Sequence, residues 1–131
     1  MTETGTTAED YLPLTPAVFH ILLALAGGER HGYGIMQEVE ALTQGQMRLG
    51  PGTLYRSIKQ MLAAGLIEEA DERPDPALDD ERRRYYRLTS IGQRVAQAEA
   101  ARLERLVHQA RARHLLGNNG QGMAEAPGGL S

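Results

Sequence analysis

The histidines are the first candidates for catalysis or metal binding, because this chain of 131 residues contains no cysteine. They are scattered along the sequence at His20, His31, His108 and His114. The last two are six residues apart and do not share one face of a helix, so no catalytic or metal-binding set forms locally. The glycines at 50 and 52 also lack the Lys-Ser/Thr that follows a phosphate-binding loop. We therefore expect no enzyme, no metal site and no cofactor.

Residues 53–63 suit a different chemistry, the reading of DNA base pairs. Apolar residues recur on one side of a helix over this segment, and the opposite side carries small, basic and amide side chains: Thr53, Arg56, Gln60 and Ala63, flanked by Lys59. Arginine can hold guanine O6 and N7 with two hydrogen bonds, and glutamine can do the same for adenine N6 and N7. No acid occurs from residue 47 to 67, whereas ordinary exposed faces mix both signs. This face is therefore predicted to enter a major groove, although inert helix faces also carry polar residues.

Composition limits the other classes of function. Apolar residues make up 41% and charged residues 24% of the chain, as in a globular protein with one modest core. The formal charge of −3 argues against a uniformly basic nucleic-acid binder, but two basic segments without acids stand out at 48–60 and 82–87. No run approaches the ~18 apolar residues that cross a bilayer, and the acidic N-terminus is unlike a signal peptide. We expect a cytoplasmic protein without membrane contact.

Capping residues and apolar spacing predict two helices in the first part of the chain. Thr15 is suited as N-cap with Pro16 at the first helical position, and this helix ends near Gly27. A second helix starts near Tyr33, and Gly45 closes it. The core residues recur at intervals of three and four positions: Val18, Ile21, Leu22 and Leu25, then Ile35, Val39 and Leu42.

Residues 50–52 (Gly-Pro-Gly) are predicted to turn the chain before a third helix, which Thr53 caps or leads and Gly65 ends. The core side of this helix is expected to carry Leu54, Ile58, Met61 and Leu62. Two short strands follow at 66–70 and 83–88, joined by the loop 71–82 into a hairpin.

Thr89 or Ser90 then caps a final helix that reaches about Leu116. Its first apolar sector is expected to face its own domain and contains Ile91, Val95 and Ala98. A second sector, rotated by ~100° from the first, contains Leu103, Leu106, Val107 and Ala110. The second sector needs a partner of its own, and the same helix of a second subunit is the most economical one. The alternative is a single curved contact within a monomer.

The order of these elements is that of a winged helix-turn-helix, so the fold class is mainly α with a small β-hairpin. We expect a flexible N-terminal arm at 1–11, the DNA-binding domain at 12–88, a long C-terminal dimerisation helix at 89–116 and a disordered tail at 117–131. In the hairpin, Arg82, Arg83 and Arg84 either neutralise phosphates or pair with Glu68, Glu69 and the acids of the loop. Both interpretations stay open.

At these residues the sequence resembles the PadR family of bacterial transcriptional regulators, in the smaller layout with one C-terminal helix. The shared motifs are HGY at 31–33, GTLY at 52–55, GLI at 65–67 and YYRLT at 85–89, and the likeness covers about residues 12–116. The resemblance implies a homodimer that binds a pseudo-palindromic DNA operator and represses transcription, with release by a small-molecule effector. It implies DNA contacts by Thr53, Tyr55, Arg56 and Lys59, and by Tyr33 near the DNA backbone. The competing hypothesis is a winged-helix module that binds proteins and no DNA.

Overall fold

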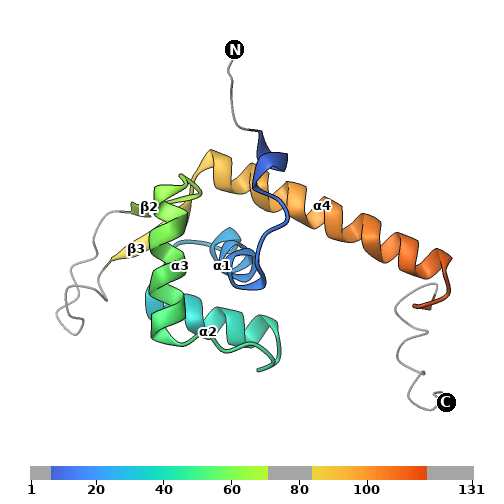
Figure 1. Cartoon of the computed structure of the whole chain (residues 1–131). Coiled ribbons are helices and arrows are strands. Elements are labelled where there is room, and N and C mark those ends of the chain that lie inside the picture. Colours follow the sequence, from blue (N-terminus) through green and yellow to red (C-terminus); the bar gives the residue numbers. More distant parts are fainter. Residues whose placement is uncertain (1–6, 71–83, 118–131) are drawn as a thin grey trace. The chain divides into compact units, whose positions relative to one another are not determined.

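The computed structural model describes residues 7–70 and 84–117, and the chain divides into two compact units at 1–99 and 100–131. The elements in chain order are η1 (Ala8–Tyr11), α1 (Pro16–Ala26), β1 (Arg30–His31), α2 (Gly32–Leu42), α3 (Pro51–Ala63), β2 (Ile67–Ala70), β3 (Tyr85–Leu88) and α4 (Ser90–Ala112) (Figure 1). The fold is mostly helical with a small antiparallel sheet, which confirms the predicted class. The predicted tail lies outside the described residues from 118 onward, as do residues 1–6.

α1 lies at the centre of the first unit, in contact with α2, α3 and β3 (Figure 1). It starts as predicted, because the Thr15 hydroxyl accepts a hydrogen bond from the backbone N–H of Val18 at 3.2 Å and Pro16 occupies the first turn. Its side chains Ile21, Leu22 and Leu25 are buried. A helix this apolar is stable only when other elements surround it, and α2, α3 and the sheet do so.

α2 corrects one core prediction. Ile35 and Val39 are fully buried, but Leu42 is 44% exposed. The buried side of the helix is formed by Gly32, Ile35 and Val39, with Met36 packed beside them. Leu42 lies only ~20° from the buried Ile35 around the helix, so its exposure reflects its place as the last residue of α2 rather than its direction.

The chain reversal before α3 also differs from the prediction. Residues 50–52 do not form a turn, because α3 begins at Pro51 with Gly50 as its N-cap. Proline is suited to a first helical position, where its missing N–H has no partner to lose. The turn lies earlier, where Gln44 and Gly45 adopt positive φ values of 51° and 80°. The Thr43 hydroxyl holds it by donating to Val39 O at 2.9 Å and accepting from Met47 N–H at 3.0 Å.

The sheet has the order β1-β3-β2, with both pairs antiparallel. The predicted hairpin is present, and its pairs run from Ile67 with Leu88 to Ala70 with Tyr85. β1 was not predicted. It contributes only Arg30 and His31, which pair with Tyr86 and Tyr85, and so short a strand carries no alternating pattern of its own. Its formation depends on the neighbouring β3.

The start of α4 bears out the predicted sector only in part: Val95 is buried as predicted, and Ala98 is half-buried. Thr89 is the N-cap, since its hydroxyl accepts from Gly92 N–H at 3.0 Å. Gly92, Val95 and Glu99 are buried, whereas Ile91 is 39% exposed. A Cβ at Gly92 would collide with the carbonyl oxygen of Leu66. This glycine therefore lies against Leu66, directly before β2. Ile91, ~100° away around the helix, points away from that contact.

The described part of the second unit contains the end of α4 and residues 113–117, which follow the helix. The helix ends at Ala112 rather than near Leu116, because His114 adopts a left-handed φ of 66°. Arg111 Nε then donates to Gly117 O at 2.7 Å. Exposed apolar side chains are concentrated here: Leu106, Val107 and Leu115 are 49%, 39% and 76% exposed. No described helix has the length and apolarity to cross a membrane.

The first unit also begins earlier than predicted. Residues 1–11 were expected to form a flexible arm, but η1 covers residues 8–11, and both Ala8 and Tyr11 pack against the hydrophobic core. The Tyr11 hydroxyl donates to the carbonyl oxygen of Ala64 at 3.3 Å. Apolar burial and this hydrogen bond hold the segment to the domain.

Candidate nucleic-acid interface

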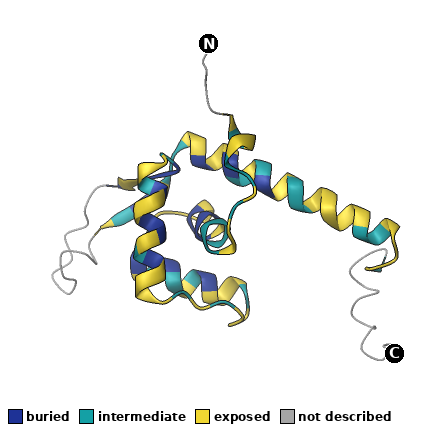
Figure 2. Ribbon diagram, viewed as in Figure 1, coloured by how far each residue is buried: buried dark blue, intermediate teal, exposed yellow. Residues whose placement is uncertain are grey.

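α3 has one buried and one exposed side along its whole length (Figure 2). The buried side consists of Leu54, Ser57, Ile58 and Met61. The apolar spacing indicated three of these, but it missed Ser57 and assigned Leu62, which is half-buried, to the core. The exposed side brings together all the residues predicted from the helical projection: Thr53, Arg56, Lys59, Gln60 and Ala63. We call these five residues the α3 face. Leu62 and Tyr55 are half-buried at its border.

The α3 face is basic and carries no acid. Arg56 Nη2 lies 3.5 Å from the hydroxyl oxygen of Thr53, one helical turn earlier. Neither Arg56 nor Lys59 forms a salt bridge with any residue in the described ranges 7–70 and 84–117. Arg48, before the helix, is bound instead to Glu40 at 3.3 Å. The two charges of the α3 face therefore remain available to an anionic partner.

Two tyrosines lie beside the first turn of α2. Tyr33 is 56% exposed, and Tyr55 directs its hydroxyl against Gly32, where any larger residue would collide with it. The ring of Tyr55 thus packs α3 against the start of α2. His31 caps that start by accepting at Nδ1 from Gly34 N–H at 2.9 Å. Sequence reasoning missed this cap, because histidine is not among the usual N-cap residues.

The arginines of the hairpin differ from those of the α3 face. Arg84 lies 3.7 Å from a carboxylate oxygen of Glu69, and Arg87 is bound to Glu68 at 2.9 Å and to Glu29 at 3.3 Å. Hydrogen bonds to Glu68 and Glu29 raise the pKa of Arg87 above its ordinary value. Of the two interpretations of Arg84, the structure shows pairing across the hairpin. Arg82 and Arg83 lie outside the described residues.

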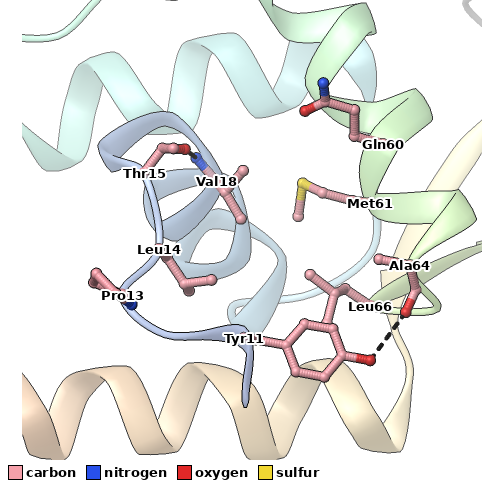
Figure 3. A pocket seen from close by; sticks show the side chains of 9 residues that line it. All are labelled: Tyr11, Pro13, Leu14, Thr15, Val18, Gln60, Met61, Ala64 and Leu66. Atoms are coloured by element: carbon pink, nitrogen blue, oxygen red, sulfur yellow. Dashed lines mark hydrogen bonds between the residues drawn. The ribbon is translucent and has the colours of Figure 1, made fainter. Parts of the chain in front are cut away.

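A shallow hollow of about 220 Å³ lies beside Gln60, between α3 and the segment that precedes α1 (Figure 3). Its walls are mostly apolar, with Leu14 and Val18 on one side and Met61 and Leu66 on the other. The hydrogen bond from Tyr11 to Ala64 closes one end of it (Figure 3). The sequence did not indicate this contact, because Tyr11 and Ala64 are 53 residues apart.

The predicted dimerisation residues lie in the second unit. Leu106 and Val107 are exposed, and Leu103 and Ala110 are half-buried. Among the residues that the structure describes, no three His, Asp or Glu side chains are grouped in a way that could hold a metal ion.

Comparisons with known proteins identify the family. The model of the transcriptional regulator PadR-like family matches residues 21–98. The transcriptional regulator Rv3488 of Mycobacterium tuberculosis is 35% identical over 90 residues, which are 69% of this chain and 78% of that protein. A 37.1 kDa protein of transposon TN4556 from Streptomyces fradiae is 34% identical over 86 residues, or 66% of this chain. The chain spans only 22% of the length of that second relative.

Two solved structures share the fold. A PadR family transcription regulator of Clostridium difficile has 21% identity and a TM-score of 0.61, over 78% of this chain and all of the other. Bacillus subtilis PadR, solved in complex with operator DNA, has 22% identity and a TM-score of 0.55, over 70% of this chain and 48% of the other. The likeness inferred from the HGY, GTLY, GLI and YYRLT motifs is confirmed, as is the expectation that the protein is no enzyme. The chain belongs to the PadR-like family of transcriptional regulators.

Proposed function

We propose that the protein is a homodimeric repressor that binds a pseudo-palindromic DNA operator in the cytoplasm and is released by a small-molecule effector. The observation that carries the proposal is the α3 face, which is exposed, basic and without acids. The proposal is supported by the Bacillus subtilis relative, which was solved in complex with operator DNA.

Each residue of the α3 face has a proposed role in DNA contact. Arg56 holds a guanine through O6 and N7, and Gln60 holds an adenine through N6 and N7. Thr53 and Ala63 allow close approach and contact thymine methyl groups. Lys59, on the flank, neutralises a phosphate.

The backbone contacts come from the elements around α3. Tyr33, exposed at the start of α2, and Tyr55, on the border of the α3 face, are proposed to contact the sugar-phosphate backbone. Arg82 and Arg83 are proposed as phosphate contacts of the hairpin. Arg84 has a smaller share in this role, because Glu69 lies 3.7 Å from its guanidinium. Such contacts set the register of the α3 face on the duplex.

Dimerisation is proposed through the second apolar sector of α4. Leu106 and Val107 leave a large part of their apolar surface in water, and Leu103 and Ala110 lie on the same sector. Burying such surface is favourable at about 25 cal/mol per Å². Two copies related by a two-fold axis bury it symmetrically and present two α3 faces to one operator.

Release follows when an effector binds the DNA-free conformation more tightly than the DNA-bound one. A ligand shifts such an equilibrium only by the difference between its two affinities. Release can be measured by adding a candidate compound to a preformed complex with operator DNA.

Selection of bound DNA from a random pool tests the proposal. We expect an inverted repeat whose half-sites lie one helical turn apart, about 34–36 Å. Binding to the selected sequence should weaken with salt, at a log-log slope of ~0.9 per phosphate neutralised. Recovery of no sequence, together with a salt-independent interaction with a protein partner, would instead establish the protein-binding module.

A further inference from the structure

The segment from Tyr11 to Leu14 contacts both α3 and α4. At one end, the Tyr11 hydroxyl donates to Ala64 O at 3.3 Å (Figure 3). At the other end, the backbone N–H of Leu14 donates to Glu99 Oε2 at 3.3 Å. Only two residues separate these anchors, so the segment can lengthen very little between them. We call residues 11–14 the strap.

Each anchor meets a polar group that accepts a hydrogen bond from the strap. Ala64 is the C-cap of α3, and the last carbonyls of a helix have no partner within it. Glu99 is only 2% exposed, and a buried carboxylate requires hydrogen-bond donors. The strap therefore donates one hydrogen bond to a helix end and one to a buried carboxyl group, each at 3.3 Å.

The packing beneath the strap is incomplete. The hollow beside Gln60 lies between Leu14 and Val18 on one side and Met61 on the other. Close packing normally fixes the distance between two elements, but at this hollow apolar contact does so only in part. The hydrogen bond from Tyr11 is the directional contact that spans it (Figure 3).

We propose that Tyr11 and Glu99 are positioning residues for the α3 face, acting through the strap. α3 behaves as a rod, so a tilt at Ala64 moves Gln60 and Arg56 relative to the rest of the domain. Base contacts require side chains to be held within about 0.5 Å, whereas contacts with phosphates tolerate more. The strap thus sets operator preference and leaves nonspecific affinity unchanged. This role rests on the proposed function.

Tyr11→Phe is the first test, because it keeps the ring and removes only the hydroxyl. At a temperature where wild type and variant are both folded, we expect operator affinity to fall about threefold to tenfold, the range of one hydrogen bond. Affinity for random DNA and its salt slope stay at the wild-type level. A variant that distinguishes operator from random DNA as well as wild type does would overturn the proposal.

Glu99 gives the second test. Glu99→Leu removes the acceptor for Leu14 and should lower operator preference to a similar extent. Glu99→Gln retains an acceptor oxygen and should restore most of it. In the double variant Tyr11→Phe/Glu99→Leu, the fold-loss of operator preference should be smaller than the product of the two single fold-losses. Independent, multiplicative losses would show that the two contacts do not form one strap. If Glu99→Leu does not fold, Tyr11→Phe alone decides.

A measurement without DNA separates this role from the proposed function. Amide NMR shifts of α3 should change in Tyr11→Phe as far as Arg56, about two turns from Ala64. Changes confined to residues near Ala64 contradict the strap whether or not DNA binds. If the wild-type protein has no operator preference but α3 shifts as expected, the proposed function fails and the strap stands.

Discussion

The α3 face and the β2-β3 hairpin both carry basic residues, yet they use them in opposite ways. On the α3 face, Arg56 and Lys59 make no salt bridge with any described residue. In the hairpin, Arg84 and Arg87 are bound to glutamates at 3.7 Å or less. The same residue type is thus available to a partner in one region and engaged within the fold in the other. Counting arginines in the sequence does not distinguish the two; only their neighbours do.

The largest effect is expected when two α3 faces can no longer act together. Leu106→Asp places a charge in the proposed dimer contact, where it cannot be buried without a partner. We expect a monomer by light scattering and operator affinity lower by about 100-fold or more, since the second half-site no longer adds its contacts. Ala101→Asp, which makes the same change of charge ~140° away around α4 at an exposed position, should stay dimeric. A dimeric mass for Leu106→Asp rules out the proposed contact.

Arg56→Ala should have the next largest effect. The loss of a bidentate base contact costs ~1–3 kcal/mol and relaxes the preference at one operator position. Arg56→Lys keeps the charge but not the planar fork, so it should retain affinity for random DNA and lose the preference. Gel-shift titrations on operators that differ at one base pair measure both. Unchanged affinity of Arg56→Ala would place the base contact elsewhere.

A smaller and uniform effect is expected for Lys59→Ala. A phosphate contact carries no sequence information, so all operators should weaken about equally. The slope of log affinity against log salt should decrease by ~0.9. Arg94→Ala is the control, because Arg94 is also exposed but lies on α4. The same change of slope in both variants contradicts a specific contact by Lys59.

The smallest effect is expected in the hairpin. Arg84→Ala combined with Arg87→Ala removes charges that glutamates already engage, so operator affinity should stay within about twofold of wild type. Thermal stability should decrease slightly at low salt and less at high salt, since exposed ion pairs are screened. A large loss of operator affinity would mean that these arginines leave their glutamates for phosphates, and the contrast with the α3 face would disappear.

Local signals in the sequence predicted most of the fold. Thr15 with Pro16 marked the start of α1, and Gly65, with a φ of 80°, ended α3 as expected. The α3 face was also predictable, because it requires only helical periodicity and the absence of acids. Each of these features depends on residues within one or two turns of each other.

Features that depend on distant neighbours could not be predicted. Glu99 carries a carboxyl group and yet is buried, and the backbone N–H of Leu14, 85 residues earlier, donates a hydrogen bond to it. Ile91 is exposed because the Leu66 carbonyl leaves room only for a glycine at position 92. In both cases tertiary contact overrides the apolar pattern. The strap was missed for the same reason, since the partner of Tyr11 is 53 residues away.

The two residues of β1 have a consequence for how a duplex would be gripped. Arg30 and His31 join α1 to α2 and at the same time pair with Tyr86 and Tyr85 of β3. The hairpin strand β3 is thereby paired through its main chain with the residues that directly precede α2, the helix that bears Tyr33. A DNA duplex would then have to adjust its groove width to this arrangement. DNA sequences that offer identical base contacts but differ in stiffness are therefore expected to bind with different affinities.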